Sequence, residues 1–140
     1  MIWSFVIRIV VAALLGGLLG LERTIAGKVA GIRTYALVSL GSALFISVSE
    51  LVVSQAGGAM AVDPLRVASQ VVVGIGFLGA GLIVFQESRV SGLTTAAGLW
   101  VAAAIGVTTG FGFYLLACVA TLLTLAVFTV LWLIEKKIKP

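Results

Sequence analysis

Histidine is absent from this chain of 140 residues, and cysteine occurs once, as Cys118. The lack of histidine removes the side chain that most often acts as a general base or a metal ligand, and a single cysteine excludes an intrachain disulfide. Charged residues are also scarce, at 10% of the chain, whereas soluble domains contain about 25%. We therefore expect neither an enzyme nor a disulfide scaffold, and neither a cofactor nor a nucleic-acid partner.

Apolar residues make up 61% of the chain, which is more than a soluble domain of this length can bury. A helix needs about 20 apolar residues to cross a bilayer, and the chain contains five such runs. We expect an all-α, polytopic membrane helical bundle that forms a single transmembrane domain over 1–140 and has the lipid bilayer as its solvent. The five expected transmembrane helices cover about 2–21, 35–53, 67–85, 93–109 and 113–134.

The distribution of basic residues predicts the orientation, because lysine and arginine are enriched in cytoplasmic loops. With five spans, one side of the membrane carries seven of them, in the loops 22–34 and 86–92 and in the C-terminal tail. The opposite side carries Arg66, and also Arg8 if its side chain reaches that interface. This predicts that the N-terminus is outside and the C-terminus inside. It also favours five spans over an alternative of four, in which the segment at 110–112 is re-entrant.

The segment Gly74-x-Gly76-x-x-Gly79 matches the spacing of the dinucleotide-binding fingerprint, but that fingerprint requires a tight turn between a strand and a helix. Here the glycines lie within an uninterrupted apolar run, and no acidic residue follows about 20 positions later. Together with Gly81 they leave most of one helix without side chains. We interpret them as a surface for close packing, against a neighbouring helix or against a second copy of the chain.

Small residues at four-residue spacing predict further helix contacts in the fourth and first spans. Glycine is common in membrane helices in general, but four consecutive matches on a short span favour a real interface. The two sets are Gly98, Ala102, Gly106 and Gly110, and Ala12, Gly16 and Gly20.

Charged residues gather near the ends of the expected spans, and we interpret most of them as interfacial anchors. Glu22 and Arg23 begin the loop between the first two spans, and Arg33 and Thr34 end it. This arrangement predicts that Glu22 pairs with Arg33, which would fix how the two spans meet.

Asp63, Arg66 and Gln70 have the i, i+3, i+7 spacing of one helix face near the start of the third span. Because a proline follows Asp63, this residue is also expected to be a helix N-cap. Two interpretations stay open. The face is a polar entrance for an ion or a small solute, or it combines an N-cap, a snorkelling arginine and an amide that hydrogen-bonds to another helix.

Polar residues at the start of the fourth span have a structural interpretation. Ser91 or Thr94 is the expected helix cap. Thr94 and Thr95 are expected to hydrogen-bond across helices or to their own helical turn.

Three blocks of residues, which cover roughly 14–112, carry a family resemblance. The blocks are Gly16–Arg23 with Gly31–Thr34 and Leu37–Gly41, then Asp63–Gly81, and finally Gly92–Ala97 with Leu99, Trp100 and Gly106. In their order, and above all in the long glycine block, they resemble the MgtC/SapB membrane family.

The resemblance implies a multi-pass protein of the bacterial inner membrane. Some members of the family are linked to growth in low magnesium, to survival inside host cells and to restraint of the proton-driven ATP synthase. We therefore expect a non-enzymatic regulator that acts through helix–helix contacts, with itself as a homo-oligomer or with a partner such as ATP synthase. The alternative is a transporter or channel for an ion or small solute, such as Mg²⁺, which enters past Asp63, Arg66 and Gln70.

The chain departs from the family pattern in two places. Longer relatives carry a soluble C-terminal regulatory domain, whereas this chain ends a few residues after the fifth expected span, so functions that need that domain are not implied. In the block Gly92–Ala97, Thr94 stands where asparagine is usual in MgtC, so no role of that amide is carried over.

Overall fold

A computed structural model describes residues 2–55, 63–86 and 89–138. In this part of the chain, five helices are long and apolar enough to cross a membrane, which confirms the predicted five-helix bundle. The helices are α1 (Ile2–Ile25), α2 (Ile32–Gln55), α3 (Pro64–Leu82), α4 (Leu93–Gly110) and a continuous fifth helix over Tyr114–Ile138. The fifth consists of α5 (Tyr114–Ala126), a π-helical turn η1 (Val127–Leu131) and α6 (Trp132–Ile138).

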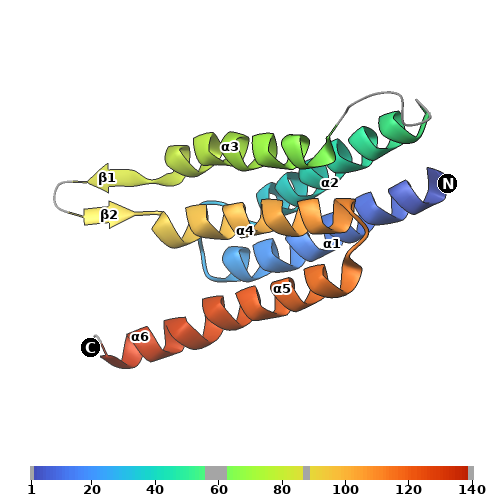
Figure 1. The fold of residues 1–140 in the computed structure, drawn as a ribbon. Helices are drawn as coiled ribbons and strands as arrows, with labels where there is room; N and C mark the ends of the chain where they lie inside the picture. The colour runs from blue at the N-terminus through green and yellow to red at the C-terminus, as the bar shows by residue number, and fades with distance from the viewer. Residues whose placement is uncertain (1, 56–62, 87–88, 139–140) are drawn as a thin grey trace.

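The centre of the bundle is formed by α1, α2 and α4, with α5 and α3 at opposite edges (Figure 1). α5 packs on α1 and α4, whereas α3 packs on α4 and, less extensively, on α2. The main cluster of buried side chains therefore comes from the central helices, the loop between α1 and α2, and the fifth helix: Leu19, Ala30, Tyr35, Leu99, Ala102, Ile105, Ala117 and Phe128. On α3 only Ile75 and Gly79 are buried, so this helix is the least covered by the rest of the chain.

Close contacts between the central helices use the small residues at four-residue spacing. A Cβ atom added to Gly16 on α1 would lie 2.6 Å from the Tyr35 carbonyl oxygen, and one added to Gly110 on α4 would lie 2.7 Å from the Ile46 Cβ. A Cβ on Gly106 would overlap the backbone of α2. Both predicted small-residue surfaces are therefore interfaces within the chain, where the missing side chains let the backbones approach.

The end of the third span differs from the prediction. α3 ends at Leu82 rather than near residue 85, and the chain continues into an antiparallel hairpin of β1 (Val84–Gln86) and β2 (Arg89–Ser91). Valine and phenylalanine in these strands favour an extended backbone. Hydropathy does not separate such a strand from a helix, because both are apolar.

The start of the fourth helix also differs. Gly92 occupies the N-cap position with a φ of 87° and no side-chain hydrogen bond, so the expected cap at Ser91 or Thr94 is wrong. A Cβ atom at Gly92 would overlap the carbonyl oxygen of Leu82. Only glycine fits a position that combines this φ with so close an approach.

The turn between the fourth and fifth helices confirms the five-span arrangement over the re-entrant alternative. α4 ends at Gly110 and α5 begins at Tyr114, with Gly112 in the turn at a φ of 82°. The backbone N–H of Phe113 donates to the carbonyl of Thr108 at 3.0 Å. The chain reverses here in a short turn.

Candidate functional site

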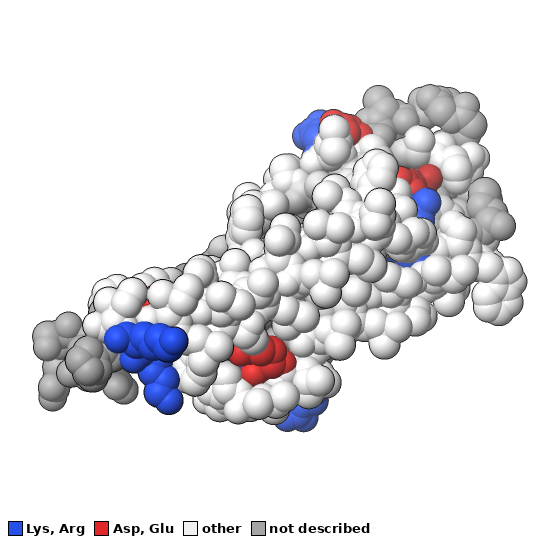
Figure 2. Space-filling view, turned by 90° about the horizontal axis from the view of Figure 1, so that it is seen from below, with Lys and Arg blue, Asp and Glu red and all other residues white. Residues whose placement is uncertain are grey.

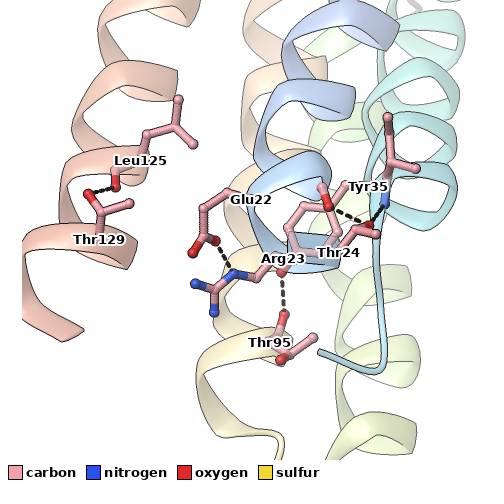
Figure 3. Close-up of polar contacts among 9 residues, drawn as sticks. Glu22, Arg23, Thr24, Tyr35, Thr95, Leu125 and Thr129 are labelled. Atoms are coloured by element: carbon pink, nitrogen blue, oxygen red, sulfur yellow. Dashed lines mark hydrogen bonds and ion pairs between the residues drawn. The ribbon is translucent and has the colours of Figure 1, made fainter. Parts of the chain in front are cut away.

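A buried polar cluster joins α1, α2 and α4 at the hairpin end of the bundle (Figure 3), and Phe128 connects it to η1. The side chain of Arg23 is 4% exposed, and its Nε donates to the carboxylate of Glu22. Its guanidinium carbon lies 3.8 Å from the centroid of the Phe128 ring. The hydroxyl of Tyr35 donates to the carbonyl oxygen of Thr95 at 3.1 Å. The cluster thus satisfies a buried cation with one carboxylate and one aromatic face.

The predicted pair of Glu22 with Arg33 is wrong, because Glu22 pairs with its neighbour Arg23. α1 continues to Ile25 instead of ending near residue 21, so Glu22 and Arg23 stay on the helix and the arginine is buried in the bundle. Arg33 and Thr34 are exposed in the first turn of α2.

Another residue closes the loop between α1 and α2. The hydroxyl of Thr24 donates to the Gly20 carbonyl and accepts from the backbone N–H of Ile32, both at 3.0 Å. Gly31 packs against the same threonine side chain. The hydroxyl thus connects the last turn of α1 with the first turn of α2.

Three residues of this end of the bundle, Thr24, Tyr35 and Phe128, carry no sequence motif. The sequence could have suggested a hydrogen bond for Tyr35, because its hydroxyl lies inside an apolar run and a buried tyrosine hydroxyl usually has a partner. Phe128 is one aromatic residue in an apolar helix, and its role depends on η1, a π-helical turn of the kind often found at functional sites.

A second charged cluster lies at the other end of the same three helices. Arg8 on α1 forms an ion pair with Glu50 on α2, and its Nη1 also donates to the Gly110 carbonyl of α4 at 2.7 Å. The guanidinium carbon lies 4.9 Å from the centroid of the Phe5 ring. Arg8 is therefore more than an interfacial anchor, because it connects α1, α2 and α4.

On the face of the molecule that Figure 2 shows, charged side chains gather toward the two ends, with a broad uncharged surface between them. This pattern matches a bundle that exposes its middle to lipid and its ends to the two interfaces. The large apolar side chains of that surface are accordingly exposed on every helix.

The polar face of α3 has the predicted cap and is open to the outside of the bundle. The Oδ1 atom of Asp63 accepts from the backbone N–H of Leu65 at 2.9 Å, which confirms the N-cap. Arg66 and Gln70 are exposed. The face therefore lines no enclosed passage within the described part of the chain.

The four glycines of α3 behave differently from those of α1 and α4. A Cβ atom added to Gly79 would lie 3.8 Å from the Ala96 Cβ, whereas one added to Gly74, Gly76 or Gly81 would meet nothing within 4 Å. Of these four glycines, only Gly79 belongs to a helix contact with another described residue. Packing of the other three against a second copy stays a prediction.

Grooves flank α3 on both sides. The groove between α2 and α3 has a volume of about 550 Å³ and a mostly apolar lining that includes Gln70, Gly41 and Gly74. The groove between α3 and α4 is smaller, about 280 Å³, and includes Trp100 and Thr108.

The two threonines at the start of α4 differ in their surroundings. Thr94 is exposed, whereas Thr95 is buried and its carbonyl oxygen accepts a hydrogen bond from the Tyr35 hydroxyl. Among the described residues, no three histidine, cysteine or acidic side chains gather as a metal site.

Five apolar helices with charges at both ends and a packed centre define a polytopic helical membrane protein. The chain belongs to the MgtC family, whose profile matches residues 9–137. It is 44% identical over 133 residues to the "Putative magnesium transporter YhiD" of Escherichia coli strain K12, covering 91% of this chain and 60% of that protein.

Two further relatives carry the name MgtC. The protein of Brucella abortus is 48% identical over 116 residues, which is 83% of this chain and 46% of the relative. The protein of Salmonella typhimurium is 42% identical over 125 residues, which is 89% of this chain and 51% of the relative. The chain thus spans about half to three fifths of the length of these relatives. No solved structure matches it.

Proposed function

We propose that this chain is a regulator in the bacterial inner membrane that supports adaptation to low magnesium by binding other membrane helices through α3. Its family membership and the magnesium-related name of the E. coli relative support the link to magnesium. The proposed orientation has the N-terminus outside and the C-terminus inside, as the lysine and arginine distribution favours. The resemblance makes ATP synthase one candidate partner.

The observation that carries this proposal is the contrast between α3 and the central helices. Gly16, Gly106 and Gly110 are covered by α2 at distances that leave no room for a side chain, so their surfaces are already used for contacts within the chain. α3, in contrast, presents polar groups and bare backbone outward. A surface of this kind fits a protein contact, since small residues and amides stabilise helix pairs in membranes.

Transport of an ion or small solute is the second candidate function. Its support is the transporter name of the E. coli relative and the polar set Asp63, Arg66 and Gln70. Because these side chains lie on the outward face of α3, a path past them requires a second subunit to enclose it. Magnesium is usually held by one or two carboxylates plus water, and Asp63 is the carboxylate of this face.

Two measurements on the same protein, one in growing cells and one after purification, separate the candidates. Growth in low magnesium is measured after expression in a strain that lacks its own relatives, and Mg²⁺ flux is measured in proteoliposomes. The regulator proposal expects growth rescue without flux. Flux that Asp63→Asn abolishes would establish the transporter instead.

A matched pair of variants tests the role of α3 in the same growth assay. Gly74→Leu places a side chain in open space on α3, and we expect loss of rescue at an unchanged protein level in the membrane. Ala126→Leu makes the same kind of change at an exposed position of the fifth helix, and we expect full rescue. Equal rescue by both variants would contradict the proposal. Co-purification of the wild type, but not of Gly74→Leu, with ATP synthase subunits tests the candidate partner.

A further inference from the structure

The outward face of α3 is the side of the helix opposite the residues that pack against the rest of the chain. Ile75 and Gly79 form the seam against the rest of the chain. Helical periodicity places Arg66, Val73 and Phe77 on the far side, and Val73 and Phe77 are 68% and 81% exposed. Nothing in the described part of the chain covers this face.

An amide lies at the edge of this face, beside the groove between α2 and α3. Gln70 is six residues after Pro64 in the chain, so its Cα lies about 9 Å along the helix axis from the start of α3 at 1.5 Å per residue. Its side chain is exposed and forms no hydrogen bond with another described residue. Lipid tails offer an amide neither donor nor acceptor, whereas a second helix that carries an amide offers both.

The charges of the face complement each other between copies. Asp63 and Arg66 are both exposed, and neither forms an ion pair within the described chain. They are three residues apart, or about 4.5 Å along the axis. Two copies inserted in the same orientation have parallel α3 helices, so each Asp63 lies about one helical turn from the Arg66 of the other copy. Both pairs form at once, because a twofold contact repeats every interaction.

We propose that α3 is a twofold interface with a second copy of this chain. Reciprocal Asp63–Arg66 pairs lie at one end of the contact and paired Gln70 amides lie deeper in the membrane. Gly74 and Gly81, at the edge of this face toward α2, let the two backbones approach. The inference rests on the proposed function only because both take α3 as the contact surface. It adds that the helix bound there belongs to a second copy of this chain.

Cysteine cross-linking in native membranes tests the inference. Cys118 is exposed, so all variants start from Cys118→Ser. Val73→Cys places a thiol at the centre of the proposed interface. Leu122→Cys is the control, because Leu122 is 67% exposed, nearly as much as Val73 at 68%, and lies at a similar distance from the start of its helix. Two tagged forms of different size are co-expressed, so that a band of both forms identifies the homodimer.

We expect oxidation to give a mixed dimer with Val73→Cys and background levels with Leu122→Cys. In the Val73→Cys form, Gln70→Leu should lower the dimerisation constant roughly fivefold, as the loss of an interhelical amide hydrogen bond does, and Gln70→Asn should restore much of it. Arg66→Glu should lower it as well, by placing like charges together. The helix content of each variant in detergent, measured by circular dichroism, controls for folding.

Several outcomes would overturn the inference. Equal mixed-dimer yields at positions 73 and 122 would do so, and so would a Val73→Cys dimer that is insensitive to both Gln70→Leu and Arg66→Glu. A cross-linked band that joins Val73→Cys to a different protein, without a mixed dimer, would also overturn it while leaving the proposed function intact. A mixed dimer whose disruption has no effect on growth in low magnesium would support the inference and count against the proposed function.

Discussion

The guanidinium of Arg23 on α1 stacks on the ring of Phe128 in the π-helical turn η1, with 3.8 Å between the guanidinium carbon and the ring centroid. The two residues are more than 100 positions apart in the sequence. Because the arginine is buried and also pairs with Glu22, the aromatic face replaces part of the hydration that its charge loses. This contact connects the fifth helix to the centre of the bundle.

Phe128→Leu should therefore lower the free energy of unfolding in detergent by about 2 kcal/mol, since the variant keeps much of the apolar volume and loses the contact with the desolvated cation. Phe45→Leu is the control, because Phe45 is exposed beside the groove on α2. The measurement is unfolding in a detergent titration followed by circular dichroism. Equal effects of the two substitutions would show that the contact between Arg23 and the Phe128 ring does not contribute to the free energy of unfolding.

Tyr35→Phe should destabilise the protein by about 1 kcal/mol, because it removes the donor to a buried carbonyl oxygen. The Tyr35 hydroxyl is fully buried and bonds to Thr95. Tyr114→Phe is the matched control, since the hydroxyl of Tyr114 forms no hydrogen bond with other described residues. Thermal unfolding of both variants in the same detergent gives the comparison, and a larger loss for Tyr114→Phe would contradict the assignment.

Breaking the ion pair of Arg8 and Glu50 should cost about 1 kcal/mol, because the two side chains are 17% and 29% exposed and water screens part of their attraction. Glu50→Gln tests this, with Glu135→Gln on the exposed α6 as control. The double exchange Arg8→Glu with Glu50→Arg should recover part of the loss that each single reversal causes. An additive loss in the double variant, measured by the same unfolding titration, would argue that no pair forms.

Gly106→Ala should prevent folding or shift the midpoint of unfolding sharply downward, because the added Cβ overlaps the Ser39 carbonyl on α2. Gly41→Ala on α2 meets nothing within 4 Å, and it should stabilise the helix by up to about 1 kcal/mol through its helix propensity. The amount of folded protein recovered from membranes, together with its unfolding midpoint, separates the two. Equal behaviour would mean that α2 and α4 are not in backbone contact.

The membrane class, the number of helices and the interfaces at Gly16, Gly106 and Gly110 could be predicted from local patterns. Length and hydropathy suffice for a span, and regular spacing reveals a small-residue face. The N-cap at Asp63 was equally predictable, because its hydrogen bond with Leu65 forms within one turn.

The partners of charged residues were not predictable in the same way. The spacing in the sequence predicts that Glu22 and Arg33 pair across a short loop, but α1 continues one turn further and directs Arg23 inward to Phe128. The hairpin after Leu82 was also missed. In both cases the result depends on where a helix ends, which apolar composition does not define.

The amino-acid sequence alone establishes that lipid is the solvent of most of this chain, because its excess of apolar side chains is more than a fold of this length can bury. It also establishes which helices have faces of small residues that permit a close approach. Only the tertiary structure decided which glycines are covered and which stay bare, and which cation meets which ring. Those outcomes depend on the rotation and crossing of whole helices, and the energy that selects them is shared among residues far apart in the chain.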